Sequence, residues 1–183
     1  RFEGAPVTAR PLAAPTVPQN PHLSANGTSS MHNDAYSTDA YRVSGPLGRD
    51  LVVRSASYGL RECATMAFDS RGRAVGLCGG LEGFHLQVMD PTSLRIIDQT
   101  RLSTRDLTSG ANPFEDICGG TYFFLDEDDH AFATTIGNGI AEVAVERDGS
   151  LTEKRRWSIA PYVDEEDCLV ATTVDWSGRL WWL

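Results

Sequence analysis

Short apolar runs and polar turns alternate along most of this chain, and one combination of them occurs three times. Each copy holds a cysteine, an apolar strand, a turn that contains aspartate and a second apolar strand. The copies span Cys63–Gly79, Cys118–Thr135 and Cys168–Leu183. They recur at intervals of roughly 50 residues, the length of one four-stranded propeller blade. The pattern therefore predicts a repeat protein built from β-strands.

The spacing of apolar positions predicts two four-stranded units, at about 61–102 and 118–157, and the first half of a third. Strands are expected at 64–68, 73–77, 84–89, 94–99, 120–125, 131–135, 140–145, 151–157, 170–174 and 179–183, with a further strand at 51–56. Aspartate, glycine and proline mark the turns between them. No stretch carries apolar residues at helical spacing over more than two turns, so a helical fold is not expected.

We interpret this all-β pattern as a β-propeller of four-stranded antiparallel blades. The alternative is a β-sandwich of about ten strands, but a sandwich does not require each unit to repeat an inner and then an outer hairpin. Propellers close with about four to eight blades. Residues 31–183 hold about three, the last one truncated, so this chain is expected to supply only part of the ring. We expect a second polypeptide, a C-terminal fragment or a subunit, to cover the open strand at Trp181 and Trp182.

The first 30 residues differ in composition from the rest of the chain. They contain five prolines, at positions 6, 11, 15, 18 and 21. Proline at this density prevents a helix, and no alternating strand pattern is present. Residues 1–30 are therefore expected to form an extended arm that is either disordered or lies across the domain surface.

The charge balance limits the classes of partner. Lysine and arginine number 16 against 25 aspartates and glutamates, which gives a net charge of -9. Nucleic-acid binders need clustered basic residues, so nucleic acid is not an expected partner. Divalent cations and small cationic ligands fit the acidic balance. The chain also holds no apolar run of about 18 residues, so no membrane span is expected.

The four cysteines bear on the compartment. An even number is compatible with two disulfides in an oxidising environment. Cys63 and Cys78 end the two strands of one hairpin on the same side, where a disulfide or a small buried thiol is expected rather than a thiolate metal site. The chain begins at Arg1, as it would after removal of a leader. A secreted or periplasmic location follows as an expectation.

Candidate chemistry gathers just before each first strand. An acidic residue precedes the cysteine in each of the segments 61–63, 114–118 and 164–168. If the units superpose, these carboxylates meet at one mouth of a central channel, where oxygen ligands would suit Ca²⁺ or another divalent cation. Crowded carboxylates also raise each other's pKa, which suits a general acid or base. We assign Glu62, Glu166 and Asp167 to the cation and Glu115 and Asp116 to catalysis.

Alternatives to this site rest on the same residues. Acidic loops facing solvent keep a protein soluble, and Asp126–Asp129 in the opposite turn is interpreted in this way. A second polar cluster holds His32, which could carry a proton, and Asp34, which could orient it. The same segment could instead pack its tyrosines against the ring. No phosphate-binding or dinucleotide-binding glycine motif is present, so no nucleotide cofactor is expected.

The strings Glu62–Arg73 and Asp167–Trp181 resemble the inner strands of propellers of the NHL, gluconolactonase and strictosidine-synthase-like superfamily. In that group an acidic residue opens an inner strand, and a turn of the type Asp-x-x-Gly-Arg-Leu-Trp follows. The resemblance implies that Glu62 and Asp167, which occupy similar positions, bind the cation of a metal-dependent lactonase. The acidic pair at Glu115 and Asp116 stands near the place of the family's Asn-Asp pair.

Two functions of different classes follow as expectations. The first is a secreted or exported propeller that binds a small molecule, together with a divalent cation, at the channel mouth. Its chemistry would resemble that of a hydrolase, or that of an isomerase or lyase. The second is a non-catalytic propeller scaffold for ligand or protein binding. A stoichiometric divalent ion that is lost on substitution of Glu62 would favour the first.

Overall fold

A computed structural model describes seven ranges of the chain, and within them the fold is all-β. The described residues are 20–24, 55–56, 62–80, 83–102, 122–135, 139–162 and 171–182. Their helical content is one three-residue 3-10 turn at Ala160–Tyr162. None of the helical segments in these ranges has the length and apolar character of a membrane span.

The first sheet contains four antiparallel strands in the order in which they occur along the chain. They are β1 (Glu62–Phe68), β2 (Ala74–Gly80), β3 (Gly83–Met89) and β4 (Ile96–Arg101). Each strand pairs with the next one, so the sheet is a simple meander. This sheet coincides with the first predicted unit.

The second sheet repeats this order, and a two-stranded sheet follows it. The second sheet consists of β5 (Phe123–Leu125), β6 (His130–Thr135), β7 (Gly139–Val145) and β8 (Leu151–Ser158). The third consists of β9 (Thr172–Val174) and β10 (Leu180–Trp182). The prediction of two four-stranded units followed by a shorter one is confirmed at this level.

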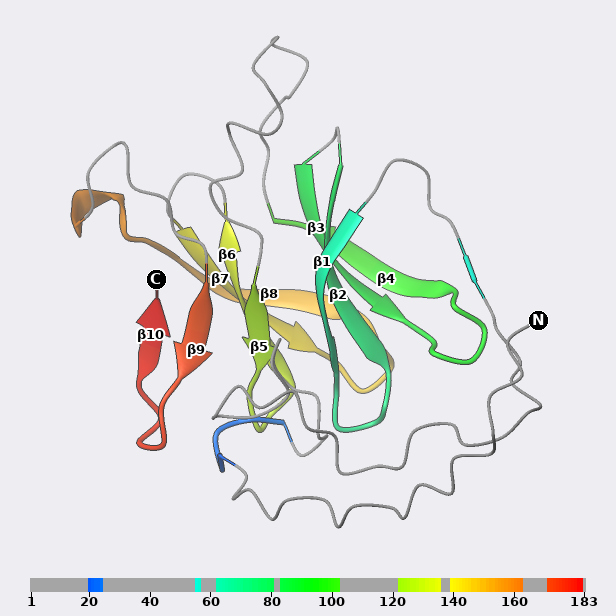
Figure 1. Cartoon of the computed structure of the whole chain (residues 1–183), viewed down its shortest axis with the longest axis horizontal. Coiled ribbons are helices and arrows are strands. Elements are labelled where there is room, and N and C mark those ends of the chain that lie inside the picture. Colours follow the sequence, from blue (N-terminus) through cyan, green and yellow to red (C-terminus); the bar gives the residue numbers. More distant parts are fainter. Residues whose placement is uncertain are drawn as a thin grey trace, which may run out of the picture.

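Successive sheets pack face to face with equivalent strands adjacent. β1 contacts β5, β5 contacts β9, and β4 contacts β8 at the opposite edge. The turns β1–β2, β5–β6 and β9–β10 all point to the lower side of the molecule in Figure 1, so the three first strands run in the same direction. We call the side with these turns the turn end, and the side where β1, β5 and β9 begin the entry end.

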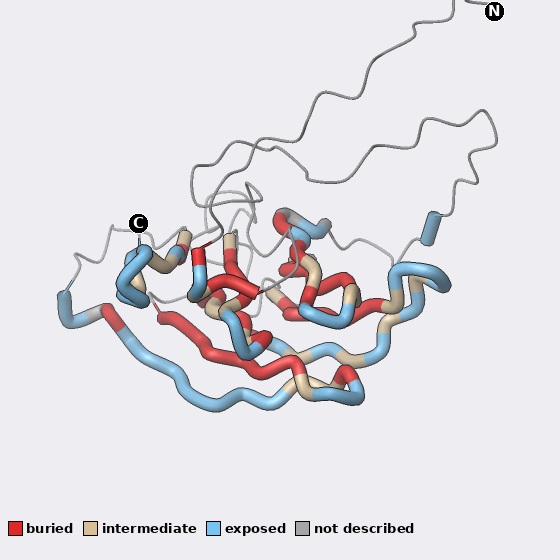
Figure 2. The backbone as a smooth tube through the Cα atoms, turned by 90° about the horizontal axis from the view of Figure 1, so that it is seen from below, coloured by how far each residue is buried: buried red, intermediate tan, exposed pale blue. Residues whose placement is uncertain are grey.

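The core fills the space between the first and second sheets. Side chains of one face of β2 and β3 meet side chains of one face of β5, β6 and β7; the cluster comprises Ala67, Val75, Leu77, Leu86, Val88, Leu102, Phe123, Leu125, Ala131, Ala133, Ala141, Val143 and Val145. Period-2 alternation along each strand places these residues on the facing sides. Buried backbone accordingly runs through the middle of the stacked sheets in Figure 2, with exposed strands at the rim.

Several predicted strand boundaries differ from the structure; for example, the strands predicted from 120 and 170 begin at Phe123 and Thr172. The strand predicted at 94–99 begins at Ile96, because Leu94 adopts a φ of 58° at the end of the preceding turn. The Asp90 carboxylate holds this turn by accepting hydrogen bonds from the backbone N–H groups of Thr92 and Ser93. Of the strand predicted at 51–56, residues 55 and 56 are described and are not in a strand; 51–54 lie outside the described residues.

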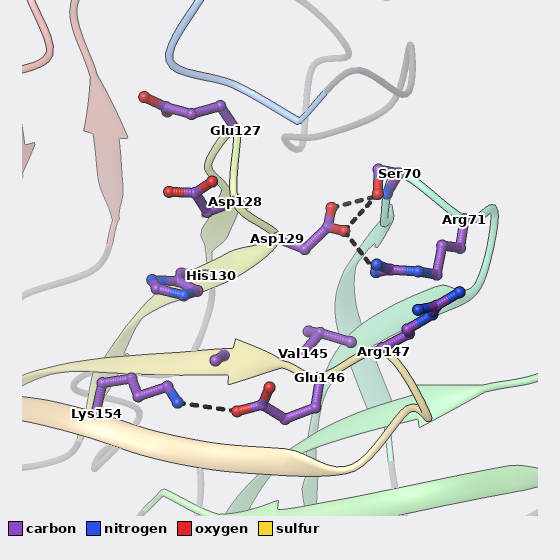
Figure 3. A pocket seen from close by; sticks show the side chains of 11 residues that line it. Ser70, Arg71, Glu127, Asp128, Asp129, His130, Val145, Glu146, Arg147 and Lys154 are labelled. Carbon is purple, nitrogen blue, oxygen red and sulfur yellow. Dashed lines mark hydrogen bonds and ion pairs between the residues drawn. The ribbon is translucent and has the colours of Figure 1, made fainter.

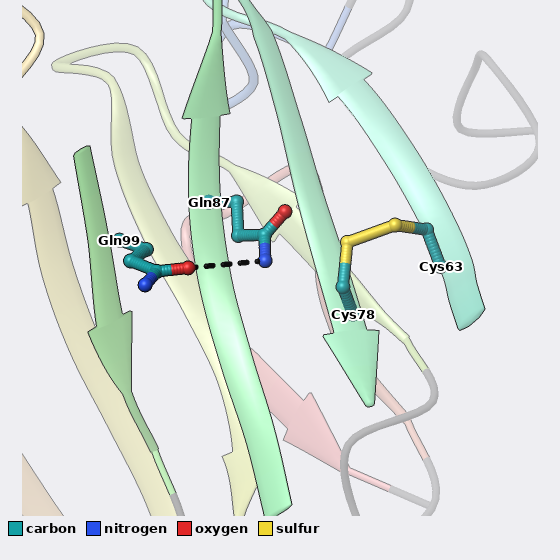
Figure 4. The surroundings of a disulfide bond; sticks show 4 residues. All are labelled: Cys63, Cys78, Gln87 and Gln99. Atoms are coloured by element: carbon teal, nitrogen blue, oxygen red, sulfur yellow. Dashed lines mark hydrogen bonds between the residues drawn. A yellow bond between two sulfur atoms is a disulfide. The ribbon is translucent and has the colours of Figure 1, made fainter. Parts of the chain in front are cut away.

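A disulfide joins β1 and β2. This is one of the two states expected for these cysteines, the other being small buried thiols. Cys63 and Cys78 are paired residues in the register of the two strands, with their Cα atoms 3.9 Å apart. On the same face, the Gln87 amide donates a hydrogen bond to the side chain of Gln99 at 3.3 Å (Figure 4). The disulfide therefore fixes the register of the first hairpin at its entry end.

Candidate functional site

Most of the predicted site falls outside the part of the chain that the structure describes. The residues outside it are His32, Asp34, Glu115, Asp116, Glu166 and Asp167. Glu62 is described by its backbone alone: it is the first residue of β1 and pairs with Gly79. It therefore lies at the entry end, and its convergence with the other carboxylates stays a prediction.

The turn end carries a backbone turn that occurs three times. An aspartate opens each copy, and its Oδ1 accepts hydrogen bonds from the N–H groups two and four residues later. The donors are Arg71 and Arg73 to Asp69, Asp128 and His130 to Asp126, and Ser177 and Arg179 to Asp175. The fourth residue of each turn has a positive φ: Gly72 at 78°, Asp129 at 63° and Gly178 at 77°.

Asp129 stands where the other two turns have glycine, and its side chain links the first two sheets. Its Oδ1 accepts hydrogen bonds from the Ser70 N–H at 2.7 Å and the Ser24 hydroxyl at 3.0 Å. Its Oδ2 accepts from the Ser70 hydroxyl and from Arg71 Nη1 at 3.3 Å (Figure 3). We call these residues, Ser24, Ser70, Arg71 and Asp129, the Asp129 cluster.

The interpretation of Asp126–Asp129 as a solvent-facing acidic turn is wrong for Asp129, of which only 3% is exposed. Aspartate tolerates the left-handed conformation because its short side chain bonds to nearby backbone groups. Four donors from two other segments then compensate for burying the carboxylate. Asp129 is therefore a structural residue of the turn end.

An open polar depression of about 370 Å³ lies beside this cluster. Its lining comes from turns of the first two sheets and from strands of the second: Ser70, Arg71, Glu127, Asp128, Asp129, His130, Ala144, Val145, Glu146, Arg147 and Lys154. On its far side Lys154 Nζ donates to Glu146 Oε1 at 2.9 Å (Figure 3). Two ion pairs are already formed here, Arg71 with Asp129 and Lys154 with Glu146, and the described ranges hold no group of three or more His, Cys, Asp and Glu able to bind a metal ion.

A second chain of polar contacts starts at His130. Its Nδ1 is 2.9 Å from Glu142 Oε1 and 3.9 Å from Asp126 Oδ2. Glu142 also lies 3.5 Å from Arg155 Nε. Burial raises the pKa of the Asp126 carboxyl above its usual range. The side chains of His130, Glu142 and Arg155 hold β6, β7 and β8 together on the face of the second sheet that points away from the first.

Part of the proline-rich arm lies across the turn end. Asn20 Nδ2 donates to the Val174 carbonyl at 3.1 Å, and the Ser24 N–H donates to the Leu125 carbonyl at 2.9 Å. His22 Nδ1 is 3.2 Å from Glu127 Oε1. Residues 20–24 thus contact the second and third sheets, and Ser24 joins the Asp129 cluster. The other residues of the arm lie outside the described ranges.

Asp129 was missed, although the sequence held a signal for it. The fourth place of the repeated turn is glycine at 72 and 178, so a non-glycine at 129 has to adopt a conformation that needs stabilising contacts. The contact with Ser70 joins residues 59 positions apart, and local sequence patterns do not report such a pair.

Comparisons with protein-family models, with curated proteins and with solved structures gave no match.

Proposed function

We propose that this chain is a section of a β-propeller that binds a small molecule, together with a divalent cation, at its entry end. The observation that carries the proposal is the repeated arrangement of inner hairpins. The first strands of three successive sheets are neighbours and run in the same direction (Figure 1). Each of them ends in the same aspartate turn. Radial repetition of four-stranded sheets around an axis gives this relation between first strands.

The two ends of the sheets differ in what they can offer a ligand. At the turn end, the carboxylates of Asp69, Asp126, Asp129 and Asp175 are engaged by backbone and side-chain donors, and the arm covers part of the surface. The entry end has Glu62 at the start of β1. In the sequence, acidic residues also precede β5 and β9. This contrast supports the entry end as the ligand site.

The proposed site uses carboxylates in two roles. Glu62, Glu166 and Asp167 provide oxygen ligands for a hard cation such as Ca²⁺, which needs six to eight of them, in part from water and backbone. When bound, the cation would polarise a carbonyl oxygen of the substrate. Glu115 and Asp116 act as general base and acid, and His32 with Asp34 carries the proton to solvent. Ester or lactone hydrolysis is the reaction that this set of groups serves most directly.

Metal analysis of the purified protein tests this function. We expect one divalent ion per chain in the wild type and its loss in Glu62→Gln. Asp128→Asn is the matched control, because Asp128 is an exposed carboxylate at the opposite end. A wild-type protein that takes up no divalent ion from Ca²⁺-containing buffer, or equal ion contents in the two variants, would reject the cation site.

A further inference from the structure

The Cys63–Cys78 disulfide joins two residues that the strand register already pairs. It crosses directly from β1 to β2 within one hairpin, and its cysteines are 15 positions apart in the chain (Figure 4). The bond therefore connects no segments that are distant in the sequence, and it links no two sheets.

The second sheet forms the same hairpin without this bond. Cys78 is the ninth residue after Asp69, which opens the first turn, and Thr135 is the ninth residue after Asp126, which opens the second. β5 and β6 pair around that second turn as β1 and β2 pair around the first. A threonine at the place of Cys78 is thus compatible with the hairpin, so the repeated fold does not account for the disulfide.

Two basic residues continue the row of the disulfide across the first sheet. His85 on β3 pairs with Cys78, and Arg101 on β4 pairs with His85. Directly paired residues of antiparallel strands present their side chains on one face, with Cβ atoms about 5 Å apart. The adjacent pair Leu77 and Leu86 points into the core, so this row lies on the opposite face. We call Cys63, Cys78, His85 and Arg101 the cysteine row.

The equivalent row of the second sheet is neutral and holds no sulfur. It consists of Thr135, Gly139 and Ser158, which are paired across β6, β7 and β8. The cysteine, the histidine and the arginine of the first sheet are therefore replaced together in the second. Neighbouring cationic side chains stabilise a thiolate, so the groups of the cysteine row match the chemistry of sulfur rather than a need of the fold.

The two cysteines differ in their access to solvent. Cys63 is exposed, whereas Cys78 is fully buried. An incoming thiolate therefore reaches Cys63 Sγ, and the sulfur of Cys78, beside His85, becomes the leaving group. Exposed disulfides are typical of labile, regulatory or catalytic bonds, and buried ones are typical of structural bonds.

We propose that Cys63 and Cys78 form a redox-active site that exchanges with an external dithiol. A thiolate of the dithiol attacks Cys63 Sγ, a mixed disulfide forms, and the electron pair of the broken Cys63–Cys78 bond goes to Cys78 Sγ. The second sulfur of the dithiol then displaces Cys63. The dithiol leaves as a disulfide, and the two cysteines take up its two electrons and, through solvent, its two protons. This site goes beyond the proposed cation site and does not depend on it.

A β-bulge beside the disulfide determines what its reduction does to the strand. The register of β1 and β2 shifts between Cys63 and Thr65. Glu62 and Cys63 thus form a short paired segment of their own, which the disulfide holds to β2, whereas the pairs from Thr65 to Phe68 are contiguous. Reduction should therefore release the first two residues of β1 and leave the rest of the hairpin in place.

Reduction of the folded chain tests the exchange. The protein is incubated with dithiothreitol, quenched with acid and alkylated, and peptide mass spectrometry then measures Cys63 and Cys78 separately from the other two cysteines. We expect a rate that is proportional to the dithiol concentration and changes less than about twofold in urea below the unfolding transition. A rate that rises steeply with urea over this range would show that the bond is reduced only through unfolding, and would overturn the proposal.

A monothiol identifies the sulfur that is attacked. With reduced glutathione, we expect the mixed disulfide on Cys63 to exceed that on Cys78 about tenfold or more. Equal amounts on the two cysteines, or an excess on Cys78, would overturn the proposal.

A pair of arginine variants tests the cysteine row. Arg101→Gln should slow the reaction with the glutathione anion about twofold at low ionic strength and weaken its dependence on salt. Arg95→Gln is the matched control, because Arg95 is also exposed and precedes β4 at the turn end. A circular dichroism spectrum and a thermal transition confirm that both variants are folded. Equal rates for the two variants would overturn the role of the row in the exchange.

Amide hydrogen exchange of the reduced protein tests the released segment. We expect exchange about tenfold faster at residues 62 and 63 and unchanged exchange from 65 to 68. Faster exchange along the whole of β1 and β2 would show that the bond holds the entire hairpin, and would overturn the proposed local release.

Discussion

The turn at 126–130 and the turn at 175–179 share one backbone conformation but differ in the state of their first aspartate. Burial raises the pKa of Asp126. In contrast, the backbone hydrogen bond from Arg179, and then the side chains of Trp181 and Ser177, lower the pKa of Asp175. The first turn belongs to a four-stranded sheet and contacts the neighbouring turn of the first sheet, whereas the second turn belongs to a sheet of two strands. Tertiary surroundings thus decide the electrostatics of a turn whose geometry is set locally.

The largest expected effect comes from substituting Asp129. Of the three turns, the one at 126–130 has an aspartate at the fourth position, whereas the other two have glycine. Asp129→Ala should lower the free energy of unfolding by about 2 to 4 kcal/mol, since it removes the buried carboxylate that accepts four hydrogen bonds from Ser24, Ser70 and Arg71. Urea denaturation measures the change. Asp129→Asn is the control: it tolerates a positive φ and keeps one acceptor oxygen, so its effect should be smaller. A change of less than about 0.5 kcal/mol in Asp129→Ala would contradict the structural role.

The next effect tests the fourth position in the exposed turn. Gly178→Ala should cost about 1 to 2 kcal/mol, because a non-glycine residue is strained at a φ of 77°. A Cβ at this position would also meet the His22 ring at 3.1 Å, whereas one at Gly72 would meet nothing within 4 Å. Gly72→Ala therefore measures the backbone term alone. Thermal unfolding of both variants should show the larger loss for Gly178→Ala, and the reverse order would contradict the placement of His22.

The two aspartates should give pH profiles of opposite sign. The pKa of Asp175 is lower in the folded than in the unfolded protein, so its contribution is present above about pH 4 and is lost as the pH falls through the folded value. The raised pKa of Asp126 works in the other direction, and its contribution is lost as the pH rises through the folded value. Relative to wild type, Asp175→Asn should lower Tm most at pH 7, and the difference should shrink as the pH falls below about 4.

In the same pH scan, the Tm of Asp126→Asn relative to that of the wild type should be highest at pH 7, since the substitution removes the buried charge. Its difference from wild type should shrink as the pH falls and the wild-type carboxyl becomes protonated. Parallel Tm-versus-pH curves for the two variants would show that the two turns do not differ electrostatically.

The smallest expected effect concerns one hydrogen bond. Trp181 Nε1 donates to Asp175 Oδ2 at 2.9 Å on an exposed surface. Trp181→Phe removes this donor, so the pKa of Asp175 should rise toward its unfolded value while remaining below it, because the backbone bonds persist. An NMR titration of the carboxyl carbon measures the shift. An unchanged pKa would indicate that the backbone donors and the Ser177 hydroxyl account for the lowered value.

The sequence was sufficient to predict features that depend on neighbouring residues in the chain. Alternation and turn residues predicted the two four-stranded meanders, and the spacing of Cys63 and Cys78 across one hairpin made a disulfide one of two expectations. Leu94 was assigned to a strand because its apolar character concealed a left-handed turn residue. The burial of Asp129 could not be predicted, since it depends on Ser24 and Ser70 from distant segments.

For the candidate site, the sequence indicated which end of the sheets to consider. Glu62 does begin β1, and β1, β5 and β9 start at the same end. The mutual distances of the six other carboxylate and histidine residues depend on segments outside the described ranges. Their convergence is therefore a consequence of the proposed repeat symmetry, and the metal analysis of Glu62→Gln addresses it directly.

The hydrogen bond between Asn20 and Val174 bears on the order of folding. Each sheet is a meander whose contacts are local, so its hairpins can form early. The Asn20 contact closes a loop of 154 residues. The entropic cost of closing this loop is offset only after the β5–β6 and β9–β10 hairpins have formed, because residues 20–24 contact these two hairpins. We therefore expect residues 20–24 to join last during refolding and to leave first on unfolding. Docking of the N-terminal arm would then be the last step of refolding. It would be observed as a slow kinetic phase that truncation of the arm abolishes.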